Sequence, residues 1–174
     1  AAFLKPLIVD RAVLRLLGPD PADPRVVRAI DLVRERVRWE YDDLRFFDGE
    51  VEPCINGSTV GIGAYFGQDV QGIVDRLLGE QLPDGGWNCE AANGSARSSF
   101  NTTICVLEAL LECERTVGGS PEVTGARLRG QEYLLERRMF RRLSTGEAIN
   151  DRKGNHNGTR FAFPAAPVTL PGLW

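Results

Sequence analysis

Apolar residues recur at intervals of three and four along most of the chain, which is the spacing of one face of an α-helix. The pattern is clearest over residues 25–39, where Val26 and Ile30 share a face and arginines occupy the opposite one. Asp23 is a suitable N-cap and Pro24 fits the first helical position, so we expect a helix to begin there. The basic outer face is most simply a solvated helix surface.

Five further segments carry a helical or continuous apolar pattern. They are residues 11–17, 55–66, 69–81, 99–111 and 123–140. Asp69 is a plausible N-cap for the third of them, and Ser120 followed by Pro121 is a start signal for the last. Gly57, Gly61 and Gly63 weaken the helical prediction for residues 55–66, because each glycine costs a helix roughly 1 kcal/mol relative to alanine. Close packing on a neighbour would explain them, and a pair of strands is the competing interpretation.

The six segments are of two kinds. Residues 11–17, 55–66 and 99–111 are apolar and rich in small residues, whereas the other three have one charged face. Helices of the first kind are buried on most sides and those of the second kind are wet on one side, which predicts an inner and an outer layer. We therefore expect an all-α fold, a partial α/α toroid of about three antiparallel helix pairs spanning residues 1–149. Residues 150–174 lack periodicity and are expected to form an irregular tail.

Charge and composition exclude several classes of function. The 174 residues carry a net charge of -3, which makes nucleic acid an unsuitable partner because no basic field is present. No apolar run reaches the roughly 18 residues that a membrane-spanning helix needs. Of the four cysteines, none forms a CxxC pair, and Cys105 and Cys113 suit small core positions. We expect a reducing, cytoplasmic location, with peripheral membrane contact left open and the oligomeric state undetermined.

One stretch carries a recognisable motif. Gln81, Gly85 and Trp87 match the Gln-x-x-x-Gly-x-Trp core of the repeat found in squalene and oxidosqualene cyclases. The helix that follows, within residues 98–110, resembles the inner helix of those proteins and of protein prenyltransferase β-subunits. Residues 129–134 and, more weakly, 28–33 resemble partial copies of the same repeat. The chain is similar to this terpenoid cyclase and protein prenyltransferase superfamily over about residues 10–145.

The simplest interpretation of this motif is structural. Gln81 can satisfy unpaired backbone groups of the turn. Gly85 and Gly86 would permit positive φ angles, and Trp87 would bury a large apolar area beneath a neighbouring helix end. We interpret these residues as a brace between repeats rather than as a catalytic set.

The resemblance implies an α/α toroid, of which this chain would be a fragment or half a ring. The Asp-x-Asp-Asp acid of squalene-hopene cyclases is absent, since Asp42 and Asp43 are the only adjacent aspartates. Prenyltransferases hold zinc with Asp, Cys and His, and the only histidine, His156, lies in the tail, so we predict neither metal nor cofactor. The Cys-Gly-Glu-Gln motif of complement-like thioester domains is absent as well.

In such toroids the site lies where loops meet the N-termini of inner helices, and two loops fit, residues 48–56 and 84–101. Their acids are the candidate catalytic residues, Asp48, Glu50 and Glu90. A buried acid with a raised pKa can protonate an alkene, although Asp48, Glu50 and Glu52 are more simply explained as solvent-facing or helix-capping acids. The candidate substrate-binding residues are Cys54, Tyr65, Phe66, Cys89 and Phe100.

Three functions remain open. The first is a cyclase-like or prenyltransferase-like protein that handles an isoprenoid, which predicts a dry, aromatic-lined pocket with one buried acid. The second is a non-catalytic toroid that serves as a binding or interaction scaffold, which predicts no pocket or no acid in it. The third is a carbohydrate-active α/α barrel with two facing carboxylates about 5–10 Å apart in an open polar groove. Fold alone does not decide among them, and whether the chain is an enzyme stays undetermined.

Overall fold

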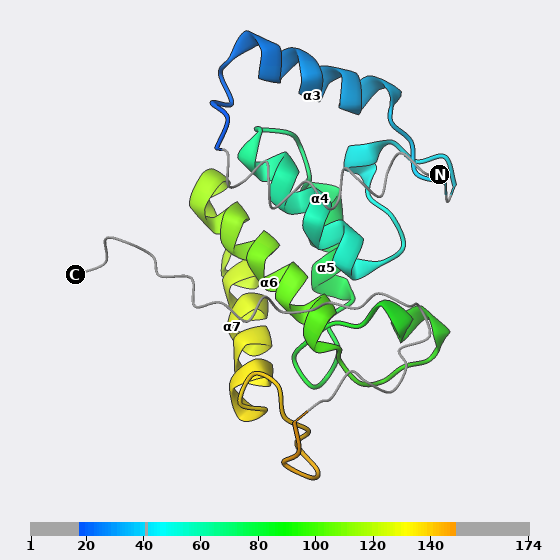
Figure 1. Cartoon of the computed structure of the whole chain (residues 1–174), viewed down its shortest axis with the longest axis vertical. Coiled ribbons are helices and arrows are strands. Elements are labelled where there is room, and N and C mark those ends of the chain that lie inside the picture. Colours follow the sequence, from blue (N-terminus) through cyan, green and yellow to red (C-terminus); the bar gives the residue numbers. More distant parts are fainter. Residues whose placement is uncertain (1–17, 41, 149–174) are drawn as a thin grey trace, which may run out of the picture.

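A computed structural model describes residues 18–40 and 42–148 of the chain (Figure 1). Within these ranges there are five α-helices and no β-strand, which confirms the all-α fold class. The helices are α3 (Pro24–Arg36), α4 (Pro53–Tyr65), α5 (Gln71–Gly79), α6 (Phe100–Cys113) and α7 (Pro121–Glu136). The helix expected at residues 11–17 and the whole of the tail expected at residues 150–174, with His156, lie outside the described residues. The toroid itself stays a prediction.

Short polar residues start the helices where the sequence predicts. Asp23 accepts a hydrogen bond from the backbone N–H of Arg25 at 2.8 Å, directly before Pro24. Ser120 caps α7 in the same way, again before a proline, and Ser99 caps α6. These caps satisfy N–H groups that have no partner within the helix, so the polar-then-proline pattern in the sequence locates two helix starts.

The helix predicted for residues 55–66 is confirmed over the competing pair of strands, although it begins two residues earlier, at Pro53. Two other details of the predicted helices are wrong. The helix expected to reach Phe140 ends at Glu136, because Arg138 and Met139 adopt positive φ angles of 47° and 69°. Val70, rather than Asp69, occupies the N-cap position of α5.

Helices α4 and α6 pack side by side and run in the same direction (Figure 1). A Cβ atom built on Gly57 would lie 2.9 Å from the backbone oxygen of Cys105, so the two backbones meet where a side chain would not fit. This close approach explains one glycine of the apolar segment. Helix α7 then returns antiparallel beside α6, after the short π-helical turn Glu114–Gly118.

Trp87 joins three helices in the core. Its side chain is fully buried, and its indole N–H donates to the carbonyl of Leu77 at the end of α5 at 2.7 Å. Its backbone N–H donates to the hydroxyl of Thr103 on α6 at 3.0 Å. On the α7 side, a Cβ on Gly130 would lie 2.9 Å from its ring. A large aromatic with both polar groups paired is the arrangement a brace requires.

Gln81 fixes the turn that carries this tryptophan. Its amide nitrogen donates to the carbonyls of Gly85 at 2.7 Å and Ala126 at 2.8 Å, so one side chain satisfies both the turn and α7. Gly85 has the expected positive φ of 93°. The φ angle of Gly86 is not positive, contrary to the prediction. Glycine is required at this position because a Cβ atom would lie 2.5 Å from the hydroxyl of Thr103.

Helix α3 differs from the rest. It crosses one end of the molecule, away from α6 and α7 (Figure 1), and none of its residues is buried. Ile30 and Val33 face the core but remain partly exposed. Among the described residues, α3 covers this end of α4 and leaves a cavity between the two helices.

Candidate functional site

The most concentrated chemistry lies at the N-terminal ends of α4 and α6. Glu52 occupies the N-cap position of α4 and Cys54 lies in its first turn, separated by Pro53, which suits that turn because it lacks an N–H. Cys89 begins the short 3-10 helix Cys89–Asn93 in the loop that leads to α6. Cys54 and Cys89 are 35 residues apart in sequence, and the packing of α4 on α6 brings them together.

The loop that carries Cys89 is held by its own polar side chains. Asn88 caps the 3-10 helix by accepting from the backbone N–H of Glu90 at 2.9 Å. The amide nitrogen of Asn88 donates to the carbonyl of Arg97 at 2.6 Å and to the hydroxyl of Ser95 at 3.0 Å. At the base of the loop, the N–H of Ser99 donates to the carbonyl of Trp87 at 2.8 Å. The brace and the capping amide together fix the position of Cys89.

The two sulfur atoms lie 3.0 Å apart. The carboxylate of Glu52 is 3.6 Å from the sulfur of Cys54, and the hydroxyl of Thr102 on α6 is 3.5 Å from the sulfur of Cys89. One donor atom from each of Glu52, Cys54 and Cys89 falls within 4.8 Å of the others. We call Glu52, Cys54 and Cys89 the thiol cluster.

The hydrogen bond between the two thiols shifts their pKa values in opposite directions. The hydrogen bond to Cys89 raises the pKa of Cys54, and burial raises that pKa further. The hydrogen bonds that Cys89 shares with Cys54 and with the hydroxyl of Thr102 lower the pKa of Cys89. Cys105 lies near enough for its charge to raise the pKa of Cys54 as well. Cys89 is therefore the more nucleophilic sulfur of the pair.

Glu50 lies beside the thiol cluster, but its groups are committed to the loop. Its carboxylate accepts from the backbone N–H of Glu52 at 2.7 Å. The fully buried amide of Asn56 accepts from the Glu50 N–H at 2.7 Å and donates to the Glu50 carbonyl at 2.6 Å. Arg76 on α5 donates to the same carbonyl at 2.8 Å. These contacts fit the capping alternative better than an acid held among apolar walls.

The other two candidate acids are exposed side chains. Asp48 is exposed and lines a hollow of about 300 Å³ together with the charged side chains of Arg34 and Arg45. Glu90 is exposed and accepts from the amide of Asn93 at 2.9 Å. Of the three acids, Asp48 lines this hollow and Glu50 and Glu90 do not, and the catalytic roles of all three stay predictions.

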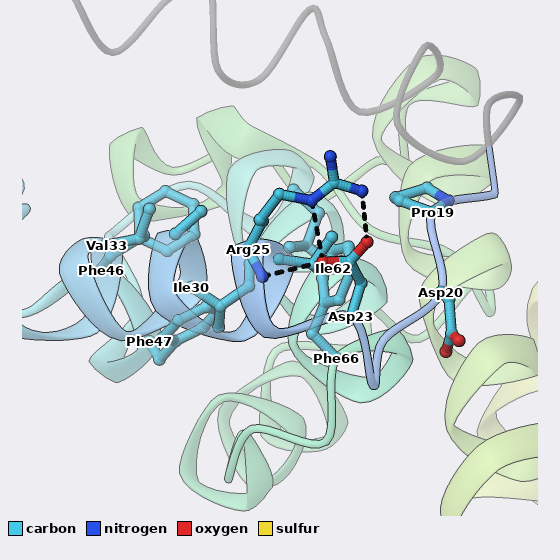
Figure 2. Close-up of a pocket in the computed structure, with 12 residues that line it drawn as sticks. Pro19, Asp20, Asp23, Arg25, Ile30, Val33, Phe46, Phe47, Ile62 and Phe66 are labelled. Carbon is cyan, nitrogen blue, oxygen red and sulfur yellow. Dashed lines mark hydrogen bonds and ion pairs between the residues drawn. The ribbon is translucent and has the colours of Figure 1, made fainter.

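An apolar cavity of about 630 Å³ lies between α3 and α4, at the opposite end of α4 from the thiol cluster (Figure 2). Its walls are aliphatic and aromatic. They are formed mainly by Val26, Ile30, Val33, Phe46, Phe47, Ile62 and Phe66. Asp20 and Asp23 reach its edge, and Figure 2 shows Asp23 paired with Arg25, its ion-pair distance being 2.7 Å. This ion pair holds the pKa of Asp23 below its usual value.

The five predicted substrate-binding residues divide between these places. Phe66 lines the cavity. Tyr65 packs edge-on against the ring of Phe66, with the ring centroids 4.9 Å apart. Cys54 and Cys89 form the thiol cluster. Phe100 packs against Tyr133 of α7, 5.5 Å between centroids. No one ligand site contains all five.

Sequence reasoning missed three features. Glu52 was interpreted only as a solvent-facing or helix-capping acid, although its spacing of two from Cys54 at a helix start could have identified a donor pair. Phe46 and Phe47, adjacent aromatics in a segment without periodicity, were not assigned to a pocket. Glu80, at the end of α5, has a pKa raised by burial and a carboxylate oxygen that is buried without a hydrogen-bond partner. It lines neither of the two hollows.

We found no match to this chain among protein-family models, curated proteins or solved structures. In the described part of the chain, none of the helices combines the length and the apolar character that crossing a bilayer requires.

Proposed function

We propose that this chain binds an apolar molecule of the isoprenoid class in the cavity between α3 and α4, and that the described residues bind it without protonating it. The observation that carries the proposal is the cavity itself. Its volume of about 630 Å³ falls within the range of roughly 300–1,000 Å³ that is usual for small-molecule sites. Its aliphatic and aromatic walls offer burial rather than hydrogen bonds.

The chemistry of the walls supports an unfunctionalised hydrocarbon chain. Phe46, Phe47 and Phe66 supply aromatic surface from two different segments, and Ile62 adds a branched aliphatic side chain. Burying apolar ligand surface here would contribute roughly 25 cal/mol per Å². The similarity of the Gln81-to-Trp87 segment to squalene cyclases makes an isoprenoid the most specific ligand of this chemistry.

The acids support binding over cyclisation. Asp48, Glu50 and Glu90 do not line the cavity, and Asp23 at its edge is paired with Arg25. Because the lowered pKa keeps Asp23 ionised near neutral pH, it cannot serve as the proton donor that an alkene needs. The walls of this cavity are mostly apolar, whereas a carbohydrate-active site would require an open polar groove.

An interaction scaffold remains the alternative, and one observation favours it. Leu128 and Leu135 lie seven residues apart on α7 and are 53% and 62% exposed, and Phe140 beyond the helix end is 52% exposed. Residues at that spacing share a helix face. An apolar strip of this kind can contact another protein.

The experiment is photolabelling with a diazirine analogue of farnesol, followed by peptide mapping. We expect labels on the walls of the cavity, at Ile30 and Phe66 above all, and competition by unlabelled farnesol. Labels confined to the exposed strip on α7, or no saturable labelling, would contradict the proposal. A cross-linker placed at Ala29 that reacts only with the first 17 residues of the chain would also contradict it, since the cavity would then be filled from within.

Two variants on α3 make a matched pair. Ala29 is exposed and lines the cavity, so Ala29→Phe should fill it and weaken farnesol binding about tenfold or more. Leu32 is exposed on the same helix and does not line the cavity, so Leu32→Phe should leave binding unchanged. Trp39 stacks on Phe46 with centroids 5.1 Å apart, so its fluorescence should report the ligand directly.

A further inference from the structure

The thiol cluster gathers three metal-binding side chains from two separate segments. Glu52 and Cys54 come from the start of α4, and Cys89 comes from the loop before α6. Their donor atoms fall within 4.8 Å of one another. Eight residues of α4 separate Cys54 from Ile62 in the wall of the apolar cavity, or about 12 Å along the helix axis. The cluster is therefore a second site, independent of the cavity and of its ligand.

We propose that Glu52, Cys54 and Cys89 bind a thiophilic divalent metal ion, with Zn²⁺ as the best match. Two thiolates and one carboxylate form a mixed sulfur and oxygen donor set, which suits zinc and is too soft for Mg²⁺ or Ca²⁺. This set contains no histidine, so it differs from the Asp, Cys and His set whose absence led the sequence analysis to predict no metal.

The distances suit a metal after a small adjustment. With Zn–S bonds of about 2.3 Å, two sulfurs in a tetrahedral site lie roughly 3.8 Å apart. The sulfurs of Cys54 and Cys89 are 3.0 Å apart, so side-chain rotation has to open this separation. Glu52 is exposed and both cysteines are partly exposed, which leaves these side chains room to move and leaves the ion a path from solvent.

Neighbouring polar groups hold the ligands of the thiol cluster in place. The hydroxyl of Thr102 lies 3.5 Å from the sulfur of Cys89, and Thr102 itself is 4% exposed on α6. Asn88 holds the loop beside Cys89 through three hydrogen bonds. Such outer contacts orient metal ligands and raise affinity.

Three protein ligands leave the fourth tetrahedral position open. An open position is the feature that separates catalytic zinc sites from structural ones, which are closed by four protein ligands. A water molecule, or a thiolate or carboxylate of a bound molecule, would occupy it.

The test uses the full chain, reduced and freed of metal with a chelator. We expect one Zn²⁺ per chain by elemental analysis, and on Co²⁺ addition a near-ultraviolet thiolate-to-cobalt charge-transfer band. Zinc X-ray absorption should show two sulfur scatterers at about 2.3 Å together with oxygen scatterers. This last measurement needs no variant, so it stands even if a substitution prevents folding.

Variants assign the ligands. Cys54→Ser and Cys89→Ser should each weaken zinc binding by more than about 100-fold, because loss of a supporting residue alone typically costs 10–100-fold. Glu52→Gln should weaken it by about tenfold or more. Cys113→Ser, on the far part of α6, and Glu90→Gln, beside Cys89 in sequence, are matched controls that should leave affinity unchanged.

Several results would overturn the site. They are zinc binding that survives Cys89→Ser, a zinc spectrum with no sulfur scatterers, and failure of the reduced wild-type chain to bind zinc. A chain that is isolated with a disulfide between Cys54 and Cys89, two hydrogens lighter by intact mass, and that binds no zinc after reduction would show a redox pair in place of a metal site.

Discussion

The two ends of α4 are built differently. At its N-terminal end the helix meets α6 backbone to backbone at Gly57, and the adjoining loop is pinned by the buried amide of Asn56. At its C-terminal end it is covered by α3, which buries none of its own residues and leaves a cavity of about 630 Å³. One helix thus carries a closely packed, polar end and a loosely covered, apolar end. The difference separates groups that can hold an ion from walls that can hold a hydrocarbon.

The largest effect is expected from removing the brace on the closely packed side. Trp87→Ala should lower the free energy of unfolding by roughly 3–5 kcal/mol, because it opens a large cavity among α5, α6 and α7. Denaturant titration followed by circular dichroism measures this change. Trp87→Phe keeps most of the apolar volume and should cost less. Similar stability for the alanine variant and the wild type would show that the tryptophan does not hold the helices together.

The next largest effect on stability is expected from adding a single methyl group to α4. Gly57→Ala places a Cβ 2.9 Å from the backbone oxygen of Cys105, and overpacking of this kind costs roughly 1–3 kcal/mol. Gly61→Ala on the same helix meets nothing within 4 Å and should stabilise it by up to about 1 kcal/mol. Thermal unfolding of the two variants measures whether each substitution lowers or raises stability. A Gly57→Ala variant as stable as Gly61→Ala would contradict the close approach of α4 and α6.

A smaller loss is expected on the loosely covered side. Ile30 of α3 packs on the core but is only partly buried, so Ile30→Ala should cost less than about 1.5 kcal/mol, below the 2–5 kcal/mol usual for a buried isoleucine. Hydrogen exchange should show α3 amides exchanging faster than those of α6. Equal protection of the two helices would mean that α3 is as firmly attached as the rest.

The smallest effect concerns reactivity rather than stability, in the reduced, metal-free chain. Alkylation follows the thiolate fraction, which rises as pH passes through the pKa. The pKa of Cys89 is lowered by its hydrogen bonds, whereas burial raises the pKa of Cys113 to about 11. Iodoacetamide should therefore modify Cys89 well before Cys113 at neutral pH, with Cys113 gaining reactivity only near pH 11. Mass spectrometry of digested samples gives the order, and the reverse order would contradict the assigned hydrogen bonds.

The sequence predicted the helices well where a local signal marks them. Asp23 before Pro24 and Ser120 before Pro121 gave two helix starts, because capping depends on residues within one turn. The end of α7 at Glu136 was missed, since nothing in the local pattern signals the positive φ angles of Arg138 and Met139.

The candidate site was predicted only in part. Cys54 and Cys89 were both placed at the mouths of inner helices, yet their contact across 35 residues and the addition of Glu52 and Thr102 needed the packed structure. The cavity beneath α3 was not foreseen, because Phe46 and Phe47 lie in a segment without periodicity and reach α3 only through tertiary packing.

By itself, the sequence determined what depends on neighbouring residues: helical periodicity, caps, and a turn that needs Gln81, Gly85 and Trp87 together. Only the tertiary structure decided which side chains from distant segments meet, because such contacts depend on how closely α4 approaches α6 and how loosely α3 covers α4. Backbone hydrogen bonding is local and leaves a mark in the sequence, whereas the meeting of two sulfurs is set by the packing of whole helices.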